Sequence, residues 1–232
     1  MKKGKAICNP ETCYLIKNTL KEWHPAILQN QKTFRVKKGD VIFKEGDEVK
    51  GVFFVNSGNV KVHIKWDAYK DLIVRFAKTG SIVGHRGIGS QSGYHVSATA
   101  LENSVICFVD IDFFEATLKV NAAFTYDLLY FFASELRESE RKMRNLAHMP
   151  VKGRVAEALL ALQEQFGISE QGFINIQLSR QDLASFAGAT YETVFRVIND
   201  LVQDKLISLS GKNITIANKA GLSTLAVLES VN

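Results

Sequence analysis

The chain has 232 residues, of which 46% are hydrophobic and 23% charged, so it can bury a core and is not a disordered tail. Lys and Arg number 29 against 24 Asp and Glu, which gives a net charge of +5. From residue 151 onward there are 7 Lys/Arg and 8 Asp/Glu. Any contact with nucleic acid in that part must therefore come from a local face and not from bulk charge.

The cysteines and the residues after Met1 are typical of a protein of a reducing cytosol. Cys8, Cys13 and Cys107 are too few and too unevenly placed for a disulfide framework, which is typical of a reducing compartment. Cys8 and Cys13 have a loose metal-like spacing, but no second pair completes four ligands, so we expect thiols and no metal. No secretion signal follows Met1, and no apolar run reaches the ~20 residues of a membrane helix. We expect a soluble cytoplasmic protein with no membrane partner.

Residues 33–111 have the pattern of short strands separated by turns. After the turn 56–58, Val60, Val62 and Ile64 alternate with polar residues, which is the period of a half-buried strand. Further strands are predicted at 52–55, 72–74 and 105–109, with glycines at 39, 46, 58, 80 and 84 for tight corners. Many short strands at such intervals indicate a sandwich, a barrel or a jelly roll.

Residues 112–148 change to a helical period. An apolar stripe with spacings of 3 and 4 predicts a heptad seam, made of Leu129, Phe132, Leu136, Ser139, Met143 and Leu146. Either this stripe packs back on the β domain or it pairs with its copy in a second subunit, and we expect the homodimer. The polar Ser139 would set the register or face a polar group. Pro150 ends the helix and is the expected hinge.

Residues 178–216 have the pattern of a winged helix-turn-helix. The stretch Ser179-Arg180-Gln181-Asp182 has the form of a capping box before a helix. Ala184 and Gly188 then suit two helices that cross closely through a left-handed turn, and Thr190 would cap the second helix at Tyr191. Strands around residues 210–212 would form the wing.

The second of these helices carries the residues most relevant to function. Glu192 and Arg196 are four apart and share a face; they form either a surface salt bridge or a base-reading pair in a DNA major groove, and we expect the latter. Arg196 would donate to guanine O6 and N7, and Glu192 would accept from a cytosine amino group. Contacts to DNA phosphates are expected from Ser179, Arg180, Gln181, Thr190 and Lys212.

Strands, long helix and winged helix-turn-helix, in this order, resemble the catabolite-activator/FNR (CRP/FNR) family of bacterial regulators from about Phe34 to Ile216. The resemblance implies an α+β fold in which an N-terminal double-stranded β-helix, a jelly roll like that of cyclic-nucleotide-binding domains, joins a C-terminal winged helix-turn-helix. The expected domains are 1–111, with an N-terminal helical segment, then the dimerisation helix 112–149 and the DNA-binding domain 150–232. The residues that carry the resemblance lie in the stretches 38–47, 58–62, 153–156 and 192–196.

The effector segment departs from the family pattern. Cyclic-AMP-binding members carry Gly-Glu-Leu and then an Arg-Ser/Thr-Ala segment, whereas here the cassette begins Gly84-His85-Arg86 and the segment 93–98 has no Arg. A buried phosphate without a cation is costly, so we expect no binding of cyclic AMP in the usual manner. The candidate effector pocket comprises Gly84, His85, Arg86, His95, Ser139 and Glu140.

Two interpretations of Arg86 stay open. A different small anion would bind at Arg86, helped by backbone N–H groups of the turn, or Arg86 is a solvated turn residue in a vestigial pocket. His85 and His95 have no third ligand, so we expect neither a metal nor another cofactor. The three cysteines do not complete the set found in oxygen-sensing members.

The resemblance implies a homodimer that binds a near-palindromic operator on double-stranded DNA and recruits or blocks RNA polymerase. Tyr191 stands where the activator has an Arg that reads an extra guanine, so a TTG-type half-site is expected. The rival function is a ligand-binding signalling module with an inactive DNA-binding domain that acts through a protein partner. We expect no enzyme, because no Ser/His/Asp, paired-carboxylate or P-loop constellation is present.

Overall fold

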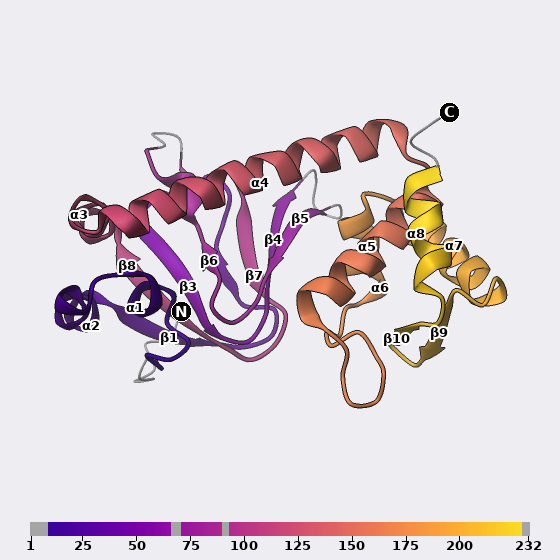
Figure 1. Cartoon of the computed structure of the whole chain (residues 1–232), viewed down its shortest axis with the longest axis horizontal. Helices are drawn as coiled ribbons and strands as arrows, with labels where there is room; N and C mark the ends of the chain where they lie inside the picture. Colours follow the sequence, from indigo (N-terminus) through magenta and orange to yellow (C-terminus); the bar gives the residue numbers. More distant parts are fainter. Residues whose placement is uncertain (1–8, 66–70, 90–92, 229–232) are drawn as a thin grey trace. The chain divides into compact units, whose positions relative to one another are not determined.

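The protein is described by a computed structural model covering residues 9–65, 71–89 and 93–228 (Figure 1). The chain divides into two compact units, Met1–Leu136 and Arg137–Asn232. Cys8 lies outside the described residues.

The N-terminal unit contains two four-stranded antiparallel sheets with the orders β1-β8-β3-β6 and β2-β7-β4-β5. Their apolar side chains enclose a core that includes Val55, Val60, Ala98 and Ile106, so the expected jelly roll is confirmed. The strands are β1 (Lys32–Val36), β2 (Val41–Phe43), β3 (Gly51–Ser57), β4 (Val60–Lys65), β5 (Asp71–Ala77), β6 (Ile82–Val83), β7 (Ser97–Ala100) and β8 (Ser104–Asp110).

Short helices cover a second core of the same unit. They are α1 (Tyr14–Asn18), η1 (Lys21–Trp23), α2 (His24–Asn30) and α3 (Ile111–Val120), and α4 (Ala122–His148) follows them (Figure 1). Phe54, Phe114 and Phe124 are almost fully buried there. Cys13 and Cys107 are buried in the same cluster, and no group of three or more potential metal ligands occurs among the described residues.

The segment 112–149 is two helices and not the single helix that its period predicted. The break lies at Asn121, whose backbone angles of φ −110° and ψ 76° are not helical. The buried Asn121 amide accepts from the Leu20 backbone N–H at 2.9 Å and donates to the Thr117 carbonyl at 2.9 Å. A long-range contact to the N-terminal segment therefore holds the break.

The C-terminal unit is a winged helix-turn-helix. Its elements are α5 (Val151–Phe166), α6 (Arg180–Ala187), α7 (Tyr191–Gln203), β9 (Ile207–Ser210), β10 (Asn213–Ile216) and α8 (Lys219–Leu228). Ser179 and Thr190 cap α6 and α7 as predicted, since their side-chain oxygens accept from the Asp182 and Thr193 backbone N–H groups. Gly188 takes the left-handed turn at φ 63°.

The last turns of α4 belong to this unit because they are bound to α5 and α6. Asn145 donates to Glu157 at 2.7 Å, and Arg141 forms an ion pair with the same carboxylate. The Lys142 ammonium lies 4.3 Å from the centre of the Phe186 ring. Although α4 ends just before Pro150 as predicted, the boundary between the two units falls within α4 and not at Pro150.

Candidate nucleic-acid interface

Helix α7 is divided into a buried and an exposed face. Val194, Ile198 and Leu201 have exposed fractions of 0%, 1% and 0%, and they pack the helix on its own unit. Glu192 and Arg196 are exposed on the other side. No ion pair between these two occurs in the part of the chain that the structure describes, so the salt-bridge interpretation finds no support and both groups face solvent.

Sequence reasoning missed Phe195, the next residue on this face. The rings of Tyr191 and Phe195 stack with centres 6.2 Å apart and planes at 17°, and they are 42% and 49% exposed. An i, i+4 aromatic pair left in water covers no core and is typical of a contact surface. The signal available in the sequence was a Phe outside the apolar period of α7.

The residues expected at DNA phosphates differ in what else they do. Ser179 donates to the Asp182 carboxylate at 2.6 Å, and the Thr190 hydroxyl lies 3.0 Å from that of Thr193, so both also stabilise helix starts. Gln181 is exposed on the first turn of α6, and Lys212 is exposed at the tip of the wing.

Arg180 connects the start of α6 to the wing. Its Nη2 lies 3.5 Å from the Gly211 carbonyl oxygen. Partial burial lowers the pKa of Arg180, yet the guanidinium stays charged at neutral pH because its ordinary pKa exceeds about 12.

The apolar stripe of α4 remains uncovered over most of its length. Leu129, Leu136 and Met143 are 63%, 61% and 65% exposed, and Leu146 is 40% exposed. Phe132 does not belong with them, because its ring packs on the core of the N-terminal unit, 5.2 Å from the ring of His85. The heptad spacing alone could not separate the covered residue from the exposed ones.

In the N-terminal unit, the cassette residues meet an acidic residue of α4. Gly84 has φ +81°, and the turn that it begins directs His85 inward, where it is 1% exposed between Phe131 and Phe132. Arg86 donates to the Glu135 carboxylate at 2.8 Å, so it is not a solvated turn residue. The structure therefore gives Arg86 an internal anionic partner.

Arg75 of β5 completes this cluster. Its Nη1 lies 3.6 Å from Glu135 Oε1, and its Nη2 donates to the Ile82 carbonyl. His85 Nε2 lies 3.6 Å from Glu135 Oε2, beyond hydrogen-bond distance, and within the described residues neither ring nitrogen of His85 has a hydrogen-bond partner. Sequence reasoning assigned no role to Glu135 or Arg75, and a lone Arg in an apolar strand was the only signal.

The electrostatics of the cluster follow from burial. Burial alone would raise the pKa of Glu135, but the neighbouring His85, Arg75 and Arg86 outweigh it and lower that pKa to about 2. Burial also lowers the pKa of His85, against the opposing effect of Glu135. At neutral pH the cluster is therefore two guanidiniums, one carboxylate and a neutral imidazole.

The other residues of the candidate effector pocket lie elsewhere in the chain's elements. His95 is exposed just before β7. Ser139 and Glu140 belong to the C-terminal unit, where Ser139 is half-buried and Glu140 is exposed. Within the N-terminal unit the structure brings together Gly84, His85 and Arg86.

Comparison with known proteins decides the family. Residues 33–121 match the model of the cyclic nucleotide-binding domain, and residues 153–225 match that of the Crp-like helix-turn-helix domain. The chain is 30% identical to the transcriptional activator protein anr of Pseudomonas aeruginosa, over 82% of this chain and 79% of that protein. It is also 30% identical to the anaerobic regulatory protein of Bacillus subtilis, over 88% and 86% of the two chains. The chain belongs to the CRP/FNR family.

Solved structures support the fold of this CRP/FNR regulator. FixK2 from Bradyrhizobium japonicum aligns with a TM-score of 0.74 at 24% identity, covering 84% of this chain and 96% of that one. The c-di-GMP responsive regulator CLP of Xanthomonas campestris aligns with a TM-score of 0.73 at 22% identity, covering 84% and 98%. None of the described helices is both long and apolar enough to span a membrane. Its family membership and its matched domains make the protein a CRP/FNR-type transcription regulator with a helix-turn-helix DNA-binding domain.

Proposed function

We propose that this CRP/FNR regulator reads a near-palindromic operator as a homodimer, with α7 of each copy in a major groove. The observation that carries the proposal is the pair Glu192 and Arg196, exposed on α7 opposite its buried Val194 face. Arg196 donates to guanine O6 and N7, and Glu192 accepts from a cytosine amino group. Arg180, Gln181 and Lys212 hold phosphates and position the unit without specifying sequence.

The uncovered stripe on α4 is the proposed dimer contact. Leu129, Leu136 and Met143 repeat every seven residues, which is the spacing at which two helices bury a common seam. A two-fold dimer presents two recognition helices about 34 Å apart, one DNA turn, and so matches a near-palindromic site.

Specificity in this proposal comes from a guanine contact and an apolar contact. Tyr191 cannot form a bidentate guanine contact, so Arg196 is the principal reader of a TTG-type half-site. The stacked Tyr191 and Phe195 rings supply apolar surface to thymine methyl groups, which are displayed in the major groove.

We propose that this regulator does not bind cyclic AMP in the manner usual for the family and that its effector is a different molecule. Glu135 already neutralises Arg86 and Arg75, so a small anionic effector at Arg86 must displace that carboxylate. Such an exchange would couple anion binding to α4, because Glu135 is an α4 residue. No metal or other cofactor enters this proposal.

RNA polymerase is the proposed second partner. The cytoplasm is the proposed location because the DNA that a bacterial regulator binds lies there. The rival function, a signalling module with an inactive DNA-binding domain, would not need an exposed Glu192 and Arg196 face. The relatives named above are transcription regulators, which favours the DNA-reading function.

Selection of binding sites from randomised duplex DNA tests the proposal. The wild-type protein should enrich an inverted repeat, and Arg196→Ala should lose the preference at one guanine per half-site at a cost of ~1–3 kcal/mol. Lys219→Ala, which removes an exposed charge at the start of α8, is the control and should select the wild-type site. An unchanged specificity profile for Arg196→Ala, or equal affinity of the wild type for all duplexes at moderate salt, would refute the assignment.

A further inference from the structure

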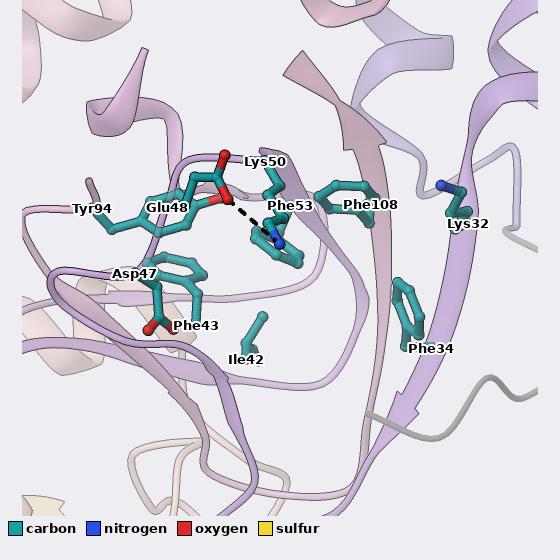
Figure 2. A pocket seen from close by; sticks show the side chains of 10 residues that line it. All are labelled: Lys32, Phe34, Ile42, Phe43, Asp47, Glu48, Lys50, Phe53, Tyr94 and Phe108. Atoms are coloured by element: carbon teal, nitrogen blue, oxygen red, sulfur yellow. Dashed lines mark ion pairs between the residues drawn. The ribbon is translucent and has the colours of Figure 1, made fainter. Parts of the chain in front are cut away.

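The N-terminal unit contains a cavity that none of the functions above uses. Its volume is about 500 Å³, within the range of small-molecule sites. It is lined by Lys32, Phe34, Ile42, Phe43, Asp47, Glu48, Lys50, Phe53, Tyr94 and Phe108 (Figure 2). None of these residues belongs to the Arg75, His85, Arg86 and Glu135 cluster.

Half of the ten residues that line the cavity are aromatic, and contacts between their rings hold them in place. Phe43 stacks on Phe53 with ring centres 5.2 Å apart, and Phe43 lies 4.3 Å from Tyr94. Phe53 lies 5.0 Å from Phe108. The Tyr94 hydroxyl donates to the Gly51 carbonyl at 2.7 Å, so the phenol is already satisfied. A preformed wall of ring faces and edges favours a flat aromatic guest.

The charged side chains at the rim of the cavity indicate the charge of a ligand that would bind there. Asp47 accepts from the Lys44 backbone N–H at 2.9 Å, and Glu48 pairs with Lys50 at 3.5 Å. Lys32 lies beside Phe34 and Phe108 in Figure 2, with its ammonium 5.8 Å from the centre of the Phe108 ring. Among the described residues no ion pair includes Lys32 or Asp47. The Asp47 carboxylate is bound to the backbone of its own loop, so Lys32 is the cation left for a ligand.

We propose that this cavity binds a planar aromatic carboxylate, with the rings around its body and Lys32 at its carboxylate. Residues 1–136 carry 18 Lys/Arg against 14 Asp/Glu, and this excess of positive charge favours an anionic ligand. The site is distinct from Arg86, where any anion must compete with Glu135.

The ring wall also reaches the cassette turn. A side chain added at Gly84 would lie 3.3–3.4 Å from Phe53, Tyr94 and Phe43. A ligand that contacts these rings should therefore change the chemical environment of Gly84, the residue before His85.

An NMR titration of the full-length protein with 15N-labelled amides and labelled isoleucine methyl groups tests the site, with 2-naphthoate as the probe. We expect the Ile42 methyl and the Gly84 amide to shift with a Kd of about 1 mM or tighter, while the Ile198 methyl on α7 stays unchanged. Neutral 2-naphthol and non-aromatic cyclohexanecarboxylate should each bind at least about threefold more weakly.

Because Lys32 is exposed, substituting it should leave the fold intact, so a change in binding can be assigned to the lost charge. Lys32→Ala should weaken naphthoate binding about three- to fivefold, and Lys32→Glu should weaken it further. Lys119→Ala, an exposed charge on α3 of the same unit, should bind as the wild type does. Absence of an Ile42 shift at saturating probe, equal affinity for naphthol, or unchanged binding by both Lys32 variants would each overturn the proposal, whatever the outcome for DNA.

Discussion

Arg86 donates to Glu135 across 49 positions of sequence at 2.8 Å, and this bond fastens the cassette turn to the helix that carries the proposed dimer seam. The carboxylate is 16% exposed and also lies within 3.6 Å of Arg75 and His85. The cassette cation Arg86 thus already has a carboxylate partner in its own chain.

This carboxylate should make the stability of the regulator depend on pH at the acid end. The folded pKa of Glu135 is about 2, below the ordinary 4.5, so its contribution is complete above pH ~4.5 and is lost as pH falls toward ~2. Glu135→Gln should lower the free energy of unfolding by about 1–3 kcal/mol at pH 7, and the difference should shrink near pH 3. Denaturant titrations at several pH values measure it. Glu140→Gln on an exposed position of α4 should show little change at any pH.

The same variant tests whether Glu135 competes with external anions. Removing the negative charge leaves Arg75 and Arg86 without a counterion, so sulfate should raise the melting temperature of Glu135→Gln more than that of the wild type. Adding Arg86→Ala should remove the extra sulfate effect. If sulfate raises the melting temperatures of the wild type and of Glu135→Gln equally, the proposal that an external anion replaces Glu135 at Arg86 is wrong.

The helix-turn-helix was predictable because its signals are local. The side chains of Ser179 and Thr190 accept hydrogen bonds from backbone N–H groups only three residues further on, and Gly188 takes the left-handed turn because it has no side chain. Four strands of the roll were equally visible, β4 through its alternation and β3, β5 and β8 as short apolar runs, whereas β1, β2, β6 and β7 were not singled out. These features depend on near neighbours, which the sequence displays directly.

What escaped prediction depends on distant partners. The break at Asn121 requires Leu20, about a hundred residues away, and the ion cluster requires Arg75 of β5 opposite Glu135 of α4. Phe132 and Leu136 both belong to the predicted seam, yet of the two only Leu136 is exposed. Spacing identifies an apolar stripe but not which part of it another element covers.

The proposed dimer should fail when a charge is placed on the seam. Leu136→Glu would bury like charges opposite each other in the seam, so we expect a monomer in light scattering at micromolar concentration. Ser134→Glu, an exposed α4 position about 200° away, should stay dimeric. A Leu136→Glu protein of unchanged mass would exclude this helix face as the subunit contact.

The exposed aromatic pair on α7 should govern one thymine position. Phe195→Ala removes the ring that stacks on Tyr191, and we expect a loss of about 1 kcal/mol on the selected operator with relaxed preference at a single base pair. The guanine read by Arg196 should keep its preference, since that contact is made by a different side chain. Quantitative mobility shifts on single-base operator variants separate the two effects. A uniform loss on every duplex would instead indicate that Phe195 only stabilises α7, and thermal unfolding of the same variant would then show a matching decrease.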